Sequence, residues 1–205
     1  MRSCGDRAGD IALESPGAGL RAWELALVRG LIFPLWHWTT SWGEAREVFQ
    51  REGQMILGEC GRMDAGRLFE RVLVPRLLGI EDSSRYWSAA MVLEHLMVTG
   101  KRMGEIIVAL TNGRQPREVI DIKDLKPTGG AAEDVVEQFG VFLKVFEETL
   151  EERMGDPGSR LDVPHPWIGP LDGHGWACLA ALHQRVHRRQ VRAIRRRICA
   201  SGAEG

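Results

Sequence analysis

The sequence predicts an all-α protein, a four-helix bundle with an extra N-terminal helical extension. Four long stretches carry apolar residues at the three- and four-residue spacing of an amphipathic helix. No stretch sustains the alternation of apolar and polar residues that is typical of a strand. The connections between the four stretches are polar and contain proline or glycine. With 205 residues, the chain is long enough for one domain with a full core.

The first 42 residues divide into two parts. Residues 1–18 are polar and rich in glycine, and we expect them to be disordered or loosely packed. Residues 19–42 predict a helical, Trp-rich extension, because apolar residues recur at helical spacing up to Phe33. Pro34 should end or kink this helix. We expect the extension to be anchored on the bundle by three aromatic side chains, Trp36, Trp38 and Trp42.

The bundle itself is predicted over residues 43–198, and its first helix runs from Gly43 to Gly61. A short helix over 64–72 should follow it. The second long helix begins near Ser83 or Ser84, either of which is a good N-cap, and ends at a turn formed by Asn112-Gly113.

The third long helix is predicted from Ala131 to Arg153, after a loop over residues 114–130. A Pro/Gly-rich segment then crosses to the last helix, which Asp172 should cap and which should end near Ile198. Residues 199–205 are expected to be a tail. The third helix has the clearest apolar stripe, which consists of Val135, Phe139, Phe142, Phe146 and Leu150.

The charge balance argues against a nucleic-acid partner. The formal net charge is −1, although residues 185–197 carry seven arginines and no acid. An arginine run at a helix C-terminus is usually a solvated face that complements the helix dipole. We therefore expect no nucleic-acid binding. A DNA affinity that depends strongly on salt would be evidence against this expectation.

Nor does the sequence predict a membrane segment. The most apolar stretch, residues 25–38, is interrupted by Arg29 and Pro34 and is too short to span a bilayer. The N-terminal residues lack the apolar core of a signal peptide. The four cysteines form no Cys-x-x-Cys pair, which fits a reducing compartment, so we expect a cytoplasmic protein.

Three histidines are the strongest functional signal. His183 and His187 lie four residues apart on the inward face of the last predicted helix, so their rings share one side. His95 lies on the inward stripe of the second long helix, together with Trp87 and Met91. Three imidazoles can hold one divalent ion and leave positions for water or substrate, which is typical of a catalytic metal site.

A structural interpretation stands beside the metal interpretation. Buried histidines often serve only as core residues whose ring nitrogens find hydrogen-bond partners. A buried pair needs partners for four ring nitrogens, and a metal satisfies two of them at once. The spacing differs from the His-Glu-x-x-His motif of metalloproteases, because Gln184 and Arg185 stand between the two histidines.

Several neighbours should support the ligands or line the pocket. Gln190 follows His187 by one turn on the same side and is a candidate hydrogen-bond partner for it. Glu94 adjoins His95 but is only a weak candidate, because successive helix residues point about 100° apart. His37, His165 and His174 are weaker candidates; His165 and His174 could line the mouth of the site, and a plain loop role is the main expectation for both. The full set expected around the metal comprises Trp87, Met91, His165, Trp167 and Gln190.

The order and separation of three motifs resemble the DinB/YfiT-like superfamily. They are Ser84-Arg85-Tyr86-Trp87-Ser88 through Leu96, the loop His165-Pro166-Trp167-Ile168-Gly169-Pro170-Leu171, and the final His-x-x-x-His-x-x-Gln. This resemblance covers residues 43–198 and implies a bundle with up-down-down-up connectivity. It also implies a metal held by His95, His183 and His187, the positions that match the superfamily's ligands.

The resemblance implies a metal-dependent enzyme in which a metal-bound water or thiol reacts with a small-molecule substrate. Members of the superfamily include thiol S-transferases and isomerases that use low-molecular-weight thiols, so a thiol S-transferase is the first expectation. A hydrolase on the same metal and a non-catalytic stress or interaction protein are the alternatives. Zinc or nickel is the expected ion, and a homodimer is the expected assembly.

Overall fold

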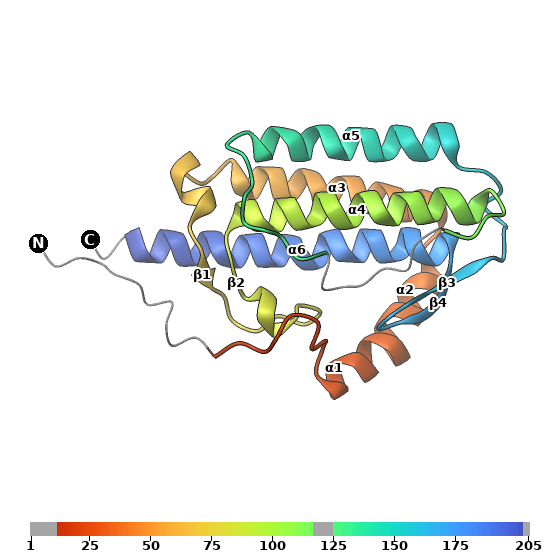
Figure 1. Ribbon diagram of the computed structural model, residues 1–205, viewed down its shortest axis with the longest axis horizontal. Coiled ribbons are helices and arrows are strands. Elements are labelled where there is room, and N and C mark those ends of the chain that lie inside the picture. Colours follow the sequence, from red (N-terminus) through yellow and green to blue (C-terminus); the bar gives the residue numbers. More distant parts are fainter. Residues whose placement is uncertain (1–11, 117–124, 203–205) are drawn as a thin grey trace, which may run out of the picture.

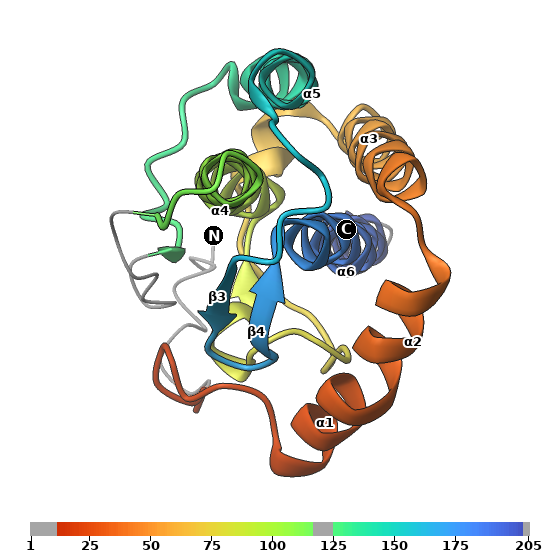
Figure 2. The same ribbon diagram turned by 90° about the vertical axis from the view of Figure 1, so that its right-hand side faces the viewer.

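Four long helices form the body of the molecule in the computed structural model, which describes residues 12–116 and 125–202. The helices lie side by side along the long axis of the protein (Figure 1). Helices α3 and α4 each pack against both α5 and α6, which closes a ring of four helices when viewed end-on (Figure 2). The mainly helical class is therefore confirmed. The bounds are α3 (Trp42–Cys60), α4 (Ala89–Thr111), α5 (Val135–Arg153) and α6 (Gly173–Gly202).

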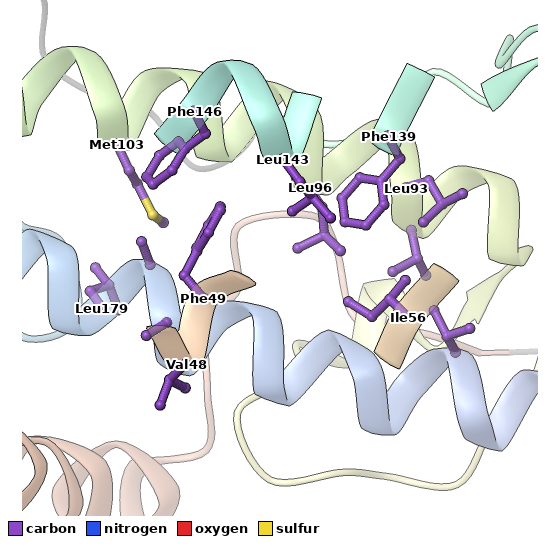
Figure 3. Close-up of a cluster of buried hydrophobic side chains, with 14 of the residues drawn as sticks. Val48, Phe49, Ile56, Leu93, Leu96, Met103, Phe139, Leu143, Phe146 and Leu179 are labelled. Carbon is purple, nitrogen blue, oxygen red and sulfur yellow. The ribbon is translucent and has the colours of Figure 1, made fainter. Parts of the chain in front are cut away.

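The core lies where the apolar stripes of the four helices meet (Figure 3). The rings of Phe49 and Phe146 stack with their centroids 4.0 Å apart and join α3 to α5. Each large apolar side chain buried in this way stabilises the fold by roughly 1.5–3 kcal/mol. The stripes supply Val48 and Ile56 from α3, Leu93 and Leu96 from α4, Phe139 and Leu143 from α5, and Leu179 from α6.

Helix α4 begins later than the sequence predicted. Ser88, rather than Ser83 or Ser84, is its N-cap, and the Ser88 hydroxyl accepts a hydrogen bond from the backbone of Met91. The residues before it form a 3-10 turn, η4 (Asp82–Ser84), and a short strand, β2 (Tyr86–Trp87). Strand β2 pairs antiparallel with β1 (Val72–Leu73), so its backbone hydrogen bonds go to a ladder and not to a helix.

The other bounds deviate less. Helix α5 starts at Val135 and not at Ala131, and α6 continues through Gly202 instead of ending near Ile198. The predicted helix over 64–72 is a 3-10 helix, η3 (Ala65–Phe69), which ends before β1. Asp172 caps α6 as predicted, since its carboxylate accepts the backbone N–H of Gly175 at 2.7 Å.

The N-terminal residues form a bent helix outside the bundle. It consists of α1 (Ala22–Leu27), a π-helical stretch η2 (Val28–Ile32) and α2 (Phe33–Thr39). The wide π turn precedes Pro34, which lacks an N–H and whose ring would clash with a regular helical carbonyl. Pro34 therefore modifies this helix but does not end it. The extension lies on the side of the bundle opposite α5 (Figures 1 and 2).

Two of the three tryptophans expected to anchor the extension do so. The indole N–H of Trp36 donates to the carbonyl of Cys178 at 3.0 Å, and the Trp42 ring packs against His174. The anchoring role predicted for Trp38 was wrong, because 84% of the surface of this residue is exposed. It follows two helix positions after Trp36, so the two side chains cannot share a face.

A hairpin connects α5 to α6. Strand β3 (Asp162–His165) pairs antiparallel with β4 (Gly169–Asp172), and His165 lies opposite Gly169. Gly169 has a φ of 102°, a conformation that favours glycine at the end of the tight turn. The turn presents His165 and Trp167 beside α6. Among the described residues, no helix combines the length and the apolar composition needed to cross a membrane.

Candidate metal centre

Helices α4 and α6 bring His95, His183 and His187 together. One ring nitrogen from each histidine lies within 4.8 Å of the corresponding nitrogens of the other two. The Nε2 atoms of His95 and His183 are 3.2 Å apart, and the ring centroids of His183 and His187 are 4.5 Å apart. His95 and His187 are buried, while His183 is partly exposed toward a cavity.

Hydrogen bonds fix which nitrogen of two of these rings carries the proton. His95 Nδ1 lies 2.7 Å from the carbonyl oxygen of Leu125, which can only accept, so Nδ1 donates. His187 Nδ1 donates in the same way to Gln190 Oε1 at 2.7 Å. The Gln190 amide is itself oriented, because its Nε2 donates to the carbonyl of Ser84. In both neutral rings, Nε2 therefore keeps a lone pair.

Burial keeps all three rings neutral. It lowers the pKa of His95 to about 4, although the hydrogen bond to Leu125 acts in the opposite direction. Burial also lowers the pKa values of His183 and His187 well below 6.5, and the neighbouring imidazoles add to the effect. Neutral imidazole is the form that binds metals.

The donor set fits a divalent metal ion. The lone pair of His95 Nε2 lies 3.2 Å from His183 Nε2, and two lone pairs in such close contact repel each other unless a proton or a cation lies between them. Three neutral imidazoles with fixed tautomers match the ligands of catalytic zinc sites, and imidazole also suits nickel. Histidine ligands in such sites characteristically donate their other N–H to a carbonyl or a carboxamide oxygen.

A cavity of about 340 Å³ opens in front of the three histidines. Its walls come from α4, α6, the β3–β4 hairpin, the segment before α4 and the N-terminal extension, and most of its lining side chains are apolar. His165 and Trp167 are among the residues that line it. An ion held by the three rings would have an open side that faces this space.

Trp87 and Met91, unlike His165 and Trp167, do not line the cavity. Trp87 is buried and packs against the rings of both His95 and His187, with centroids 5.2 and 6.3 Å away. Met91 is buried in the bundle core. Trp87 therefore packs against two rings of the three-histidine group, whereas Met91 contributes to the packing of the core.

His37 and His174 lie away from the three-histidine group. The His174 ring donates to the carbonyl of Thr40 at 2.8 Å and packs against His37 and Trp42, so it helps to attach the extension to α6. Glu94 accepts hydrogen bonds from the backbone N–H groups of Thr128 and Gly129, so its carboxylate is bound to the loop before α5.

Sequence reasoning missed the loop that reaches the site between α4 and α5. Its Leu125 carbonyl binds His95, and Lys126 lies over the Trp87 ring at 5.5 Å from the centroid. Lys126 also donates to the Glu81 carboxylate and to Ser84 Oγ. Burial acts to raise the pKa of Glu81, but the hydrogen bond and charge of Lys126, together with backbone hydrogen bonds from Gly19 and Gly17, shift it downward overall. A backbone carbonyl leaves no signal in a sequence, so only the lysine could have been noticed.

Comparison with known proteins supports the fold. No protein-family model and no curated protein matches the chain. One solved structure that matches is described as "Crystal structure of TT2238, a four-helix bundle protein", with a TM-score of 0.50 and 21% sequence identity. The match covers 75% of this chain and 98% of the other. At this identity the likeness shows a shared four-helix-bundle fold.

Proposed function

We propose that this protein is a metal-dependent enzyme of the DinB/YfiT-like superfamily, with up-down-down-up connectivity of its four helices. His95, His183 and His187 hold one divalent ion, zinc or nickel, and a small molecule is the substrate. The proposal rests on one observation: ring nitrogens with oriented lone pairs converge at the end of a mostly apolar cavity.

The chain's own groups set the conditions for the chemistry. When bound, a divalent ion at three neutral ligands lowers the pKa of a water or thiol ligand toward neutrality. The Leu125 carbonyl and the Gln190 amide keep the imidazoles in the metal-binding tautomer. The apolar cavity walls limit the access of bulk water, which strengthens electrostatic interactions inside the cavity.

Thiol S-transfer is the reaction we propose first, with a low-molecular-weight thiol as the second substrate. The motifs that resemble the DinB/YfiT-like superfamily support it, since that superfamily includes thiol S-transferases. The test supplies the purified protein with glutathione, mycothiol or bacillithiol and a fluorogenic electrophile. We expect turnover with one of these thiols, and we expect the His183→Ala variant to lose it. Arg192→Ala is the control, because Arg192 is an exposed residue of the same helix outside the group.

Hydrolysis is the second candidate, and the apolar cavity favours it. The many hydroxyl groups of a sugar-based thiol would need polar partners that these walls mostly lack. A water molecule needs little space. Esters and amides offered to the same protein distinguish the two reactions, since cleavage without any added thiol identifies a hydrolase. Absence of turnover with every substrate, despite bound metal, would identify a non-catalytic bundle.

The assembly and the compartment are proposals as well. We propose a homodimer in the cytoplasm, with neither nucleic acid nor membrane as a partner. Sedimentation equilibrium of the full chain tests the dimer through its mass. Filter binding to DNA at low and high salt tests the nucleic-acid statement, for which we expect no salt-dependent affinity.

A further inference from the structure

We propose that the cavity before the three histidines is a chamber for a substrate with an uncharged, apolar body, and that the N-terminal extension forms the wall that selects this body. The inference rests on the proposed function, because it concerns the same site. It gives the extension, which lies outside the four-helix bundle, a direct role in substrate choice.

The extension contributes a continuous apolar surface to the chamber. Four of its side chains line the cavity: Leu20, Val28, Ile32 and Phe33. Val28 and Ile32 lie at the two ends of the π-helical stretch, four residues apart, and both are on the cavity side. Their neighbour Leu31 is 58% exposed and does not line the cavity. Leu78, Ile80, Leu182 and Ile168 supply apolar surface from other elements.

The charged groups of the chamber are mostly engaged elsewhere. Lys126 and Glu81 are bound to each other, and Arg185 donates to Glu52 and lies over the Trp36 ring. Arg189 is exposed to solvent. Away from Arg189, a charged substrate body would lose its hydration without finding an unengaged counterion, whereas an apolar body would gain by leaving water.

The polar end of the substrate is defined by His165. Its Nδ1 accepts the backbone N–H of Trp167 at 3.2 Å, so the proton of the neutral ring sits on Nε2. Burial lowers the pKa of His165 to about 4 and keeps the ring neutral at pH 7. His165 therefore offers a hydrogen-bond donor, and the substrate's polar head carries an acceptor such as a carbonyl oxygen.

The wall is fixed in place. Glu24 of the extension is buried and accepts a hydrogen bond from Arg76, while the backbone N–H of Gly19 donates to Glu81. Trp36 is bonded to the backbone of α6. A volume of about 340 Å³ lies at the lower end of the range of ligand pockets, roughly 300–1,000 Å³. The chamber therefore suits a small molecule.

A chain-length series of simple ketones tests the chamber without needing the metal. Straight-chain 2-alkanones from butanone to nonanone are titrated calorimetrically into the full chain, both as purified and after chelation. Burial of one more CH2 group should tighten binding by roughly three- to fourfold until the chamber is full. An affinity that does not change with chain length would overturn the proposal.

Two neighbouring substitutions test the wall. Ile32→Ser should weaken octanone binding by roughly tenfold or more and flatten the chain-length dependence. Leu31→Ser, the exposed neighbour, should leave both unchanged. If Ile32→Ser loses its helical circular dichroism, Val28→Ser takes its place. Equal effects of the wall and control substitutions would overturn the role of the extension.

The outcome is separable from the proposed function. If the protein binds ketones with the predicted dependence on chain length but holds no metal, the proposal of an apolar chamber stands and the proposal of a metal-dependent enzyme is contradicted. If the protein holds metal but binds octanone no better than butanone, the proposal of a metal-dependent enzyme stands and the proposal of an apolar chamber is contradicted.

Discussion

At the scale of single residues, the partners of the histidines matter as much as the histidines. His187 would be an ordinary core residue if Gln190 did not accept its Nδ1 proton and thereby direct the Nε2 lone pair toward the other rings. Gln190 is fully buried, and its amide connects His187 to the backbone of Ser84. The site is thus built as a chain of hydrogen bonds that ends on a backbone carbonyl.

Replacing Gln190 should weaken the site without removing a ligand. Gln190→Met keeps the approximate side-chain volume but leaves His187 Nδ1 and the Ser84 carbonyl without this partner. Loss of such a partner typically lowers metal affinity by about 10- to 100-fold. Competition with a chromophoric chelator measures this change. Unchanged affinity in a folded Gln190→Met variant would show that the hydrogen bond does not position His187.

His165 gives a pH dependence of stability with a defined sign. Its folded-state pKa is about 4, against about 6.5 in the unfolded chain. Between these values the unfolded state binds a proton that the folded state does not, so stability falls as pH falls from 6.5 to 4. Below pH 4 the loss levels off.

The expected size of this loss is up to roughly 3 kcal/mol. Urea unfolding of metal-free protein at several pH values measures it. His165→Phe should show a shallower decline than the unmodified chain over the same window. Parallel declines would mean that His165 is not held neutral by burial.

At the scale of elements, close packing of helices depends on glycine. A Cβ atom at Gly53 of α3 would lie 2.5 Å from the Leu143 side chain of α5, which is itself fully buried. A Cβ atom at Gly58, one turn further along the same helix, would meet open space. The two glycines thus separate the effect of packing from that of helix propensity.

The two alanine substitutions should therefore change the free energy of unfolding in opposite directions. Gly53→Ala should destabilise the protein by roughly 1–3 kcal/mol through overpacking, less a gain in helix propensity. Gly58→Ala should stabilise it by up to about 1 kcal/mol, since only the propensity changes. Thermal unfolding of both variants measures the two changes in Tm. Similar changes in Tm for the two variants would contradict this prediction.

Helix interiors could be predicted from the sequence, but several helix ends could not. The stripe from Val135 to Leu150 identified α5 because its periodicity depends on that helix alone. The start of α4 depended on the pairing of β2 with β1, which lies 14 residues before β2 in the sequence. Such pairing between distant segments leaves little local signal.

The same reasoning explains what was predicted of the site. The histidines stood out through their spacing, and the structure brings all three together. The Leu125 carbonyl and the apolar wall from the extension come from contacts between distant segments, which one sequence does not record. The anchoring role predicted for the three tryptophans was wrong for Trp38, because their spacing did not show which face of the helix would meet the bundle.

At the scale of the whole molecule, the extension and the bundle act as one unit. Glu24 of α1 is 2% exposed, and Arg76 links it to Asp82 in the segment before α4. This network crosses from the extension to the bundle beside the cavity. Loss of this network should detach the extension under conditions in which the bundle is still folded.

Glu24→Ala should make the extension sensitive to proteases. The substitution removes a charged hydrogen bond from Arg76, which contributes roughly 1.5–3 kcal/mol, although Asp82 retains part of the network. Limited proteolysis followed by mass spectrometry should show early cleavage within residues 19–40. Cleavage at the same rate as in the unmodified chain would contradict this linkage.

The central claim is that three imidazoles from two helices bind one metal ion. Elemental analysis of protein purified without an affinity tag or chelator tests it most directly, with His183→Ala as the variant and Arg192→Ala as the folded control. We predict about one divalent ion per chain in the unmodified protein and in Arg192→Ala, and little in His183→Ala. Equal metal content in all three proteins, or none in the unmodified chain, would contradict the account.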